Sequence, residues 1–163
     1  MAKRITTMAL LTAVALILFV VEAQIPQPVP IPGVKLGLAN IVTVYAMFRL
    51  GPKDTLAILL VRILLGSIFA GAVMSLIFSL AGGLLCYLAM LGLRKVLTEK
   101  QIWVCSILGA MCHNLGQMAA TLAVYQTVTV LIYLPALLLS GLITGLFTGL
   151  VAQYLLEKLP KRI

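Results

Sequence analysis

Charged side chains are scarce in this sequence, and acidic ones are the scarcest. Only 10% of the 163 residues are charged, whereas 63% are hydrophobic, and the mean hydropathy is +1.18. A soluble domain carries about a quarter of its residues as charged side chains. The polar surface is too small to cover a water-soluble globule, so the composition predicts an all-α integral membrane protein with a single transmembrane domain over residues 1–163.

Cysteine and histidine are also rare. The three cysteines, Cys86, Cys105 and Cys112, lie in apolar runs without a Cys-x-x-Cys pair, which predicts inert core thiols. The one histidine has no second histidine or carboxylate nearby in the sequence, so we expect no metal site. A nucleophile elbow, a Gly-rich phosphate loop and a Walker motif are all missing. These absences predict a protein that is not an enzyme and has no intrinsic cofactor.

The basic residues follow a pattern along the chain. The net charge is +8, and ten of the twelve basic residues flank alternate ends of the apolar runs. This is the positive-inside pattern of membrane proteins, which favours membrane orientation over nucleic-acid binding as the role of the charge. It predicts a multi-pass protein of the cell membrane with both termini in the cytoplasm. The ten are Lys3, Arg4, Arg49, Lys53, Arg94, Lys95, Lys100, Lys158, Lys161 and Arg162.

Six apolar segments are candidates for membrane spans, each of which needs about 20 residues. They cover residues 4–23, 35–50, 54–71, 75–96, 102–125 and 135–158, the second being short. The first run lacks a small-x-small cleavage site, so we expect an uncleaved span rather than a signal peptide. The sequence therefore predicts six transmembrane helices, bounded by membrane lipids.

The connector between the first two spans is rich in proline. Residues 24–40 contain four prolines, which fix φ and remove backbone donors, so we expect a stiff, extended segment. Glu22 and Gln24 end the first span on the outer side, and Lys35 and Asn40 open the second. Since this connector is on the outer side, we predict a lid, with Glu22, Lys35 and Asn40 at the entrance of a site beneath it. A Glu22–Lys35 ion pair that only pins the loop is the alternative.

Polar residues inside two spans mark where a ligand could bind. Arg62 lies about 13 Å from the inner end of its helix, and an arginine at that depth costs at least about 2.5–3.5 kcal/mol, so it should face the interior and pair. His113, Asn114 and Gln117 share a face of the fifth span at a similar depth. We predict that Arg62 binds an anionic or carbonyl group and that the other three donate or accept hydrogen bonds. Structural pairing within the bundle remains the alternative.

Small residues recur at the spacing of helix-packing seams. The sixth span carries Gly141, Gly145 and Gly149, and the third carries Gly66 and Ala70. We expect these two seams to pack within the bundle. Ala9 and Ala13 form a third pair on the first span.

Together these features resemble the S components of energy-coupling factor (ECF) transporters, small membrane proteins that capture vitamins and related solutes. The likeness is strongest to a subgroup labelled "Gx transporter family" or "heptaprenyl diphosphate synthase component I". It is carried by Pro-Gly-Val-Lys-Leu-Gly-Leu-Ala-Asn-Ile-Val at 32–42, Arg-Leu-Gly-Pro-Lys at 49–53 and Arg-Ile-Leu-Leu-Gly-Ser at 62–67. The resemblance implies six spans, a capping first outer loop, and an Ala9–Ala13 motif that docks on a transmembrane coupling subunit with ATPases on separate chains.

The second label raises a chemical question, because prenyl diphosphate synthases hold Mg²⁺ between paired aspartates. This chain has one aspartate, Asp54, which we expect to cap a helix, and three distant glutamates. It therefore lacks the residues for that reaction.

The sequence thus favours a substrate-binding S component that captures a small solute from the outer side, with a pocket between the third, fifth and sixth spans. One alternative is an accessory membrane subunit for isoprenoid, quinone or flavin metabolism. The other is a structural membrane scaffold.

Overall fold

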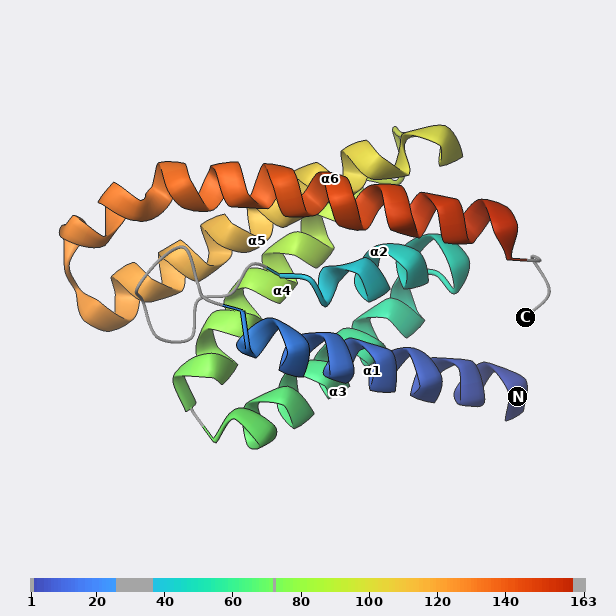
Figure 1. Cartoon of the computed structure of the whole chain (residues 1–163), viewed down its shortest axis with the longest axis horizontal. Coiled ribbons are helices and arrows are strands. Elements are labelled where there is room, and N and C mark those ends of the chain that lie inside the picture. The colour runs from blue at the N-terminus through green and yellow to red at the C-terminus, as the bar shows by residue number, and fades with distance from the viewer. Residues whose placement is uncertain (1, 26–36, 72, 160–163) are drawn as a thin grey trace.

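The computed structural model describes residues 2–25, 37–71 and 73–159, and these residues form helices and no strand. The start of the helix at residues 2–23 and the end of the helix at residues 134–158 lie at the same end of an elongated bundle (Figure 1). The helices are α1 (Ala2–Ala23), α2 (Asn40–Arg49), α3 (Pro52–Ala70), α4 (Val73–Leu93), α5 (Ile102–Tyr125) and α6 (Leu134–Lys158), with short 3-10 segments η1 (Glu99–Gln101) and η2 (Val128–Tyr133).

Four segments of the described chain are long and apolar enough to cross a membrane: Ala2–Ala23, Val73–Leu93, Ile102–Tyr125 and Val128–Lys158. Helix α3 has 19 residues but carries Lys53, Asp54 and Arg62 within them. The prediction of an all-helical protein built from apolar, membrane-length helices is therefore confirmed at this coarser level.

Helix α2 is the exception in length, since it has ten residues where a sixteen-residue span, 35–50, was expected. At about 1.5 Å per residue it is about 15 Å long, half of a hydrocarbon core. Gly37 has φ of +89°, a backbone conformation that excludes it from a helix, and the turn at residues 37–39 leads into Asn40. The first helical N–H groups donate back to this turn, as in Asn40 N–H to Gly37 C=O at 2.9 Å. The start of α2 therefore lies inside the bundle.

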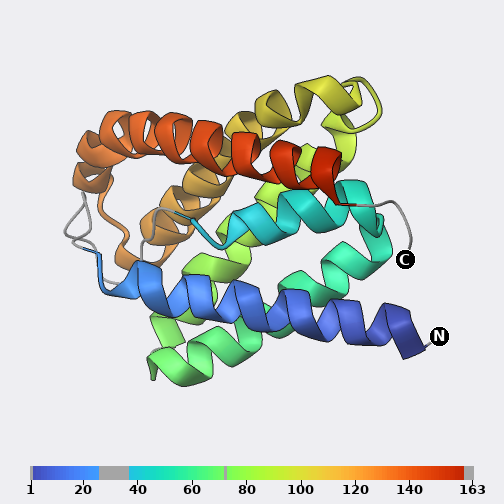
Figure 2. The same cartoon turned by 45° about the vertical axis from the view of Figure 1, so that its right-hand side comes forward.

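The helices differ in how deeply they are embedded. Helix α5 packs along both α4 and α6, whereas α1 lies at the side of the bundle against α3 and α2 (Figures 1 and 2). An apolar core joins α2, α3, α4 and α5 and is formed by buried residues such as Val44, Met47, Leu59, Ile63 and Met90. Polar side chains gather beyond this core, around the start of α2.

The glycine seam of α6 packs within the bundle, as the sequence predicts. A Cβ atom on Gly145 would approach the Ile107 backbone at 2.7 Å, and one on Gly149 would approach the Trp103 backbone at 2.7 Å. The Ser106 and Thr148 hydroxyls form a buried hydrogen bond of 3.0 Å across the same seam. On α3, Gly66 lies under the Phe19 ring of α1, while Ala70 is exposed.

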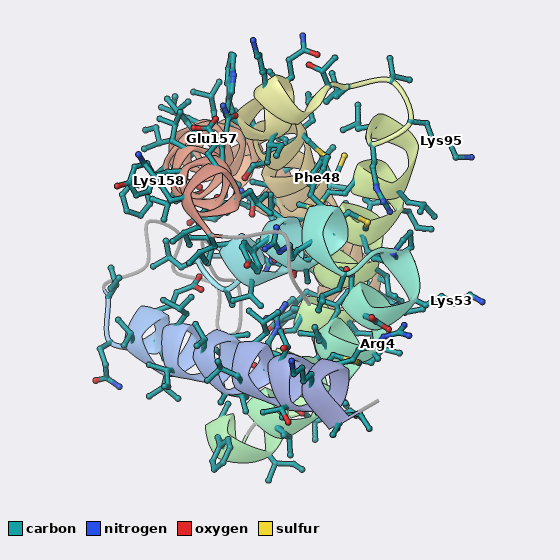
Figure 3. All side chains as sticks on the ribbon, turned by 90° about the vertical axis from the view of Figure 1, so that its right-hand side faces the viewer. Arg4, Phe48, Lys53, Lys95, Glu157 and Lys158 are labelled. Carbon is teal, nitrogen blue, oxygen red and sulfur yellow. The ribbon has the colours of Figure 1, made fainter. Side chains whose placement is uncertain are left out.

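One end of the bundle is basic. Figure 3 views this end, where Arg4, Lys53, Lys95 and Lys158 project from four different helices or connectors. The 3-10 segment η2 lies at the opposite end and exposes apolar residues, among them Val128 and Ile132. The charge asymmetry that the sequence predicts between the two ends is therefore present in the fold.

Candidate functional site

Six of the seven predicted binding residues are buried in the described structure. None of their side chains is more than 4% exposed, although no apolar residue is among them. They are Glu22, Asn40, Arg62, His113, Asn114 and Gln117. The seventh, Lys35, and most of the predicted proline-rich lid, residues 26–36, lie outside the described residues.

Glu22 lies in the last turn of α1 and closes on the turn before α2. Its Oε1 accepts a hydrogen bond from Gly37 N–H at 2.5 Å, and its Oε2 accepts one from Leu38 N–H at 2.9 Å. The sequence places Glu22 at the entrance of the site, but the carboxylate is 1% exposed. It therefore belongs to the interior and fixes the turn in place.

Arg62 lies on the bundle side of α3 and is 4% exposed. Its Nη2 is buried and makes no hydrogen bond to any described residue. The Glu22 carboxylate and the His113 ring are within electrostatic range of the guanidinium. Among the described residues the one ion pair with N···O within 4 Å is elsewhere, between Arg4 and Asp54, so Arg62 Nη2 is a buried donor without a described partner.

His113 and Gln117 form the α5 side of the same region. His113 Nε2 and Gln117 Nε2 are 3.0 Å apart, so the ring nitrogen accepts from the amide when the proton is on Nδ1. A Cβ atom on Gly37 would lie 3.4 Å from the His113 ring and 2.8 Å from Asn40 Nδ2. The turn at residues 37–39 therefore lies between α2 and α5.

Asn114 points to a different neighbour than the sequence predicts. Its Nδ2 donates to Leu137 C=O of α6 at 2.5 Å, and a Cβ on Gly141 would meet that nitrogen at 2.7 Å. Asn114 thus holds α5 to α6. We therefore restrict the name polar cluster to Glu22, Asn40, Arg62, His113 and Gln117.

The polar cluster draws on more helices than the predicted pocket between the third, fifth and sixth spans. Glu22 comes from α1, Asn40 from α2 and Arg62 from α3, while α5 supplies the remaining two. Sequence reasoning missed Gly82 of α4, where a Cβ would approach His113 C=O at 2.8 Å and Gln117 Cγ at 2.9 Å. The Gly82–Gly83 pair inside an apolar run was the available signal.

Several polar atoms of this region have no hydrogen-bond partner among the described residues. They include Arg62 Nη2, Asn40 Nδ2, His113 Nδ1 and Asn114 Oδ1. Leaving one such atom buried and unsatisfied costs about 1–3 kcal/mol. The described residues contain no group of three potential metal ligands, and the three cysteines are free thiols. The region therefore offers buried hydrogen-bonding groups and one buried guanidinium.

Comparison with known proteins gives one family. The family model described as "Heptaprenyl diphosphate synthase component I" matches residues 11–155. No curated protein and no solved structure gives a significant match. The matched region contains all five residues of the polar cluster.

Proposed function

The chain belongs to the heptaprenyl diphosphate synthase component I family, and from this membership we propose that it is a non-catalytic membrane subunit that binds a small solute at the polar cluster. The family description makes it one component of a larger system. With a single aspartate in the sequence, the chain lacks the paired aspartates that would hold Mg²⁺ for prenyl transfer. In this proposal the chain itself binds the solute and catalyses no reaction.

The observation that carries the proposal is the unused donor of Arg62. A buried guanidinium is costly in an apolar environment unless its N–H groups are paired. Arg62 Nη2, Asn40 Nδ2 and His113 Nδ1 have no described hydrogen-bond partner, and Asn40 Nδ2 lies beside Gly37 of the turn. A solute with an oxygen acceptor for Arg62 and further polar groups for Asn40 and His113 would satisfy all three. A purely structural cluster would instead pair these atoms with one another.

We propose that the solute is bound in order to be transported. In the proposal the solute is captured from the outer side, and the protein acts as an S component that hands it to a transmembrane coupling subunit driven by ATPases on other chains. The resemblance to S components supports this role, and so does the exposure of Ala9 and Ala13 on α1. The basic end, which includes the start of α1 and the end of α6, would face the cytoplasm.

Arg62→Met tests the binding proposal. Methionine keeps the apolar length of the side chain but removes its donors, so the variant should fold and lose solute binding by about 10- to 150-fold, the worth of a charge-assisted hydrogen bond of about 1.5–3 kcal/mol. Binding is measured as ligand-induced thermal stabilisation with a panel of vitamins, flavins, quinones and a prenyl diphosphate. Lys53→Met, on the exposed start of the same helix, is the matched control and should bind as the wild type does.

The panel also separates the alternatives. Selective stabilisation by a prenyl diphosphate would favour an accessory subunit that presents substrate to a synthase, the role that the family description supports. If native mass spectrometry finds no bound ligand and no panel member stabilises the wild type, the protein is a scaffold and the binding proposal is wrong.

A further inference from the structure

Large apolar side chains are exposed where α3 ends and α4 begins. Three of them are 71–72% exposed and a fourth is 39% exposed. These four residues, here called the tip, are Ile68, Phe69, Val73 and Met74. The serines on either side give the tip little polar character, because the Ser67 hydroxyl donates to Leu64 C=O of its own helix at 2.8 Å and Ser75 is buried.

The sequence around the tip carries no charge. Residues 63–93 contain no lysine, arginine, histidine, aspartate or glutamate. The connector at residues 126–133 lies toward the same end of the bundle (Figures 1 and 2) but exposes polar side chains next to its apolar ones. Its exposed polar residues are Gln126, Thr127 and Thr129. The connector therefore has groups that water can solvate, whereas water would be an unfavourable neighbour for the tip.

The depth of the tip follows from the helices that carry it. Helix α3 has 19 residues, so it is about 28 Å long, slightly less than a hydrocarbon core of about 30 Å. Both α3 and α4 are inclined to the long axis of the bundle, along which α1 and α6 run (Figures 1 and 2). Lys53 and Lys95 project at the opposite, basic end of this helix pair (Figure 3). An inclined pair of this length ends within the hydrocarbon.

The tip also continues an apolar surface along the sides of the two helices, where Leu64 is 55% exposed and Leu88 is 58% exposed. We infer that the tip inserts among the lipid acyl chains of the leaflet opposite the basic end, while residues 126–133 lie at the water interface of that leaflet. Only two residues separate Ala70 from Val73, so few backbone groups lack a helical partner, as lipid requires. A docked helix would instead favour small side chains. This placement requires neither a solute nor a coupling subunit.

Tryptophan fluorescence tests the depth of the tip. The chain has one tryptophan, Trp103, so Phe69→Trp and Thr129→Trp are each combined with Trp103→Phe, and Trp103→Phe alone gives the background. The purified full chain is reconstituted in phosphatidylcholine vesicles, with lipids brominated on their acyl chains or with aqueous iodide as quencher. Because inserted apolar side chains reach about 5–10 Å into the boundary of the acyl region, brominated lipid should quench Phe69→Trp at least about twofold more than Thr129→Trp. Iodide should quench the two variants in the reverse order.

Two results would overturn the inference. Equal quenching of both variants by iodide would place the tip in water. A tryptophan at the tip that neither quencher reaches would mean that a protein surface, from a second copy or another subunit, covers it. If Phe69→Trp does not fold, Val73→Trp takes its place on the other helix, at a position that is 71% exposed, with the same expected order of quenching.

Discussion

At the scale of single residues, glycine decides how closely the helices approach the polar cluster. Gly82 of α4 faces α5 where His113 and Gln117 project, and a Cβ there would lie 2.8 Å from His113 C=O. A backbone carbonyl cannot move aside without moving its helix. Gly92 is on the same helix, but a Cβ there would meet nothing within 4 Å.

Alanine should have opposite effects at these two glycines. Gly82→Ala should destabilise the protein by about 1–3 kcal/mol through overpacking and should weaken solute binding, because it pushes α5 away from α4. Gly92→Ala should be neutral or stabilising by up to about 1 kcal/mol, the gain in helix propensity. Thermal unfolding in detergent measures both, and a Gly82→Ala variant as stable as Gly92→Ala would show that the helices are not in close contact.

The burial of a residue is easiest to predict from the sequence where a single polar side chain interrupts a long apolar run. Arg62, His113 and Gln117 stand out within apolar runs, and the structure buries all three. The roles of the acidic residues were harder to predict. Asp54 was expected to cap α3, but Gly51 occupies that position and Asp54 makes no cap hydrogen bond. It binds Arg4 instead, 50 residues away, and such a pairing has no local signature.

At the scale of elements, α1 is attached to the bundle at separate points along its length. Near one end, Arg4 Nε donates to Asp54 Oδ2 at 2.7 Å and Arg4 Nη2 to Oδ1 at 2.5 Å. Near the other end of α1, Glu22 accepts a hydrogen bond from the turn before α2. Between Arg4 and Glu22 along α1, the Phe19 ring packs on Gly66 of α3. The remaining helices begin and end close to the expected spans because Gly, Pro and charged residues punctuate the sequence there. The late start of α2 follows from the turn at Gly37, and the carboxylate that accepts from this turn, Glu22, is 15 residues away in the sequence.

The Arg4–Asp54 pair should couple α1 to α3 weakly. Arg4 is 61% exposed on its side chain and Asp54 9%, so solvent screens the pair from one side. A double-mutant cycle of Arg4→Gln and Asp54→Asn, read from thermal unfolding, should give a favourable coupling that disappears in 1 M salt, where the Debye length is about 3 Å. Lys3→Gln in place of Arg4→Gln should give no coupling with Asp54→Asn. A coupling that persists at high salt would mean that the pair is shielded from solvent.

At the scale of the whole molecule, the basic end, the polar cluster and the exposed face of α1 lie in different places. Its basic end carries the charges (Figure 3), and its interior carries the polar cluster. Helix α1 presents a third feature, a face with exposed Ala9, Ala13, Leu10 and Ile17. The Gly141–Gly149 seam is predicted to pack inside and does, whereas the resemblance to S components implies that the Ala9–Ala13 pair docks on a coupling subunit. Its exposure places it where another helix could approach closely, since small side chains let backbones come together in lipid.

That placement yields the last prediction, which separates partner docking from solute binding. Ala9→Trp combined with Ala13→Trp would hold a second helix several ångströms away, so co-purification with a co-expressed coupling subunit should fall at least tenfold. Solute-induced thermal stabilisation should not change, because neither alanine belongs to the polar cluster. Ala119→Trp, an equally exposed alanine on α5, should leave both measurements at the wild-type level. Because α1 also supplies Glu22 to the interior, a loss of solute binding with docking intact would mean that this face packs within the bundle, and the docking role of α1 would then be wrong.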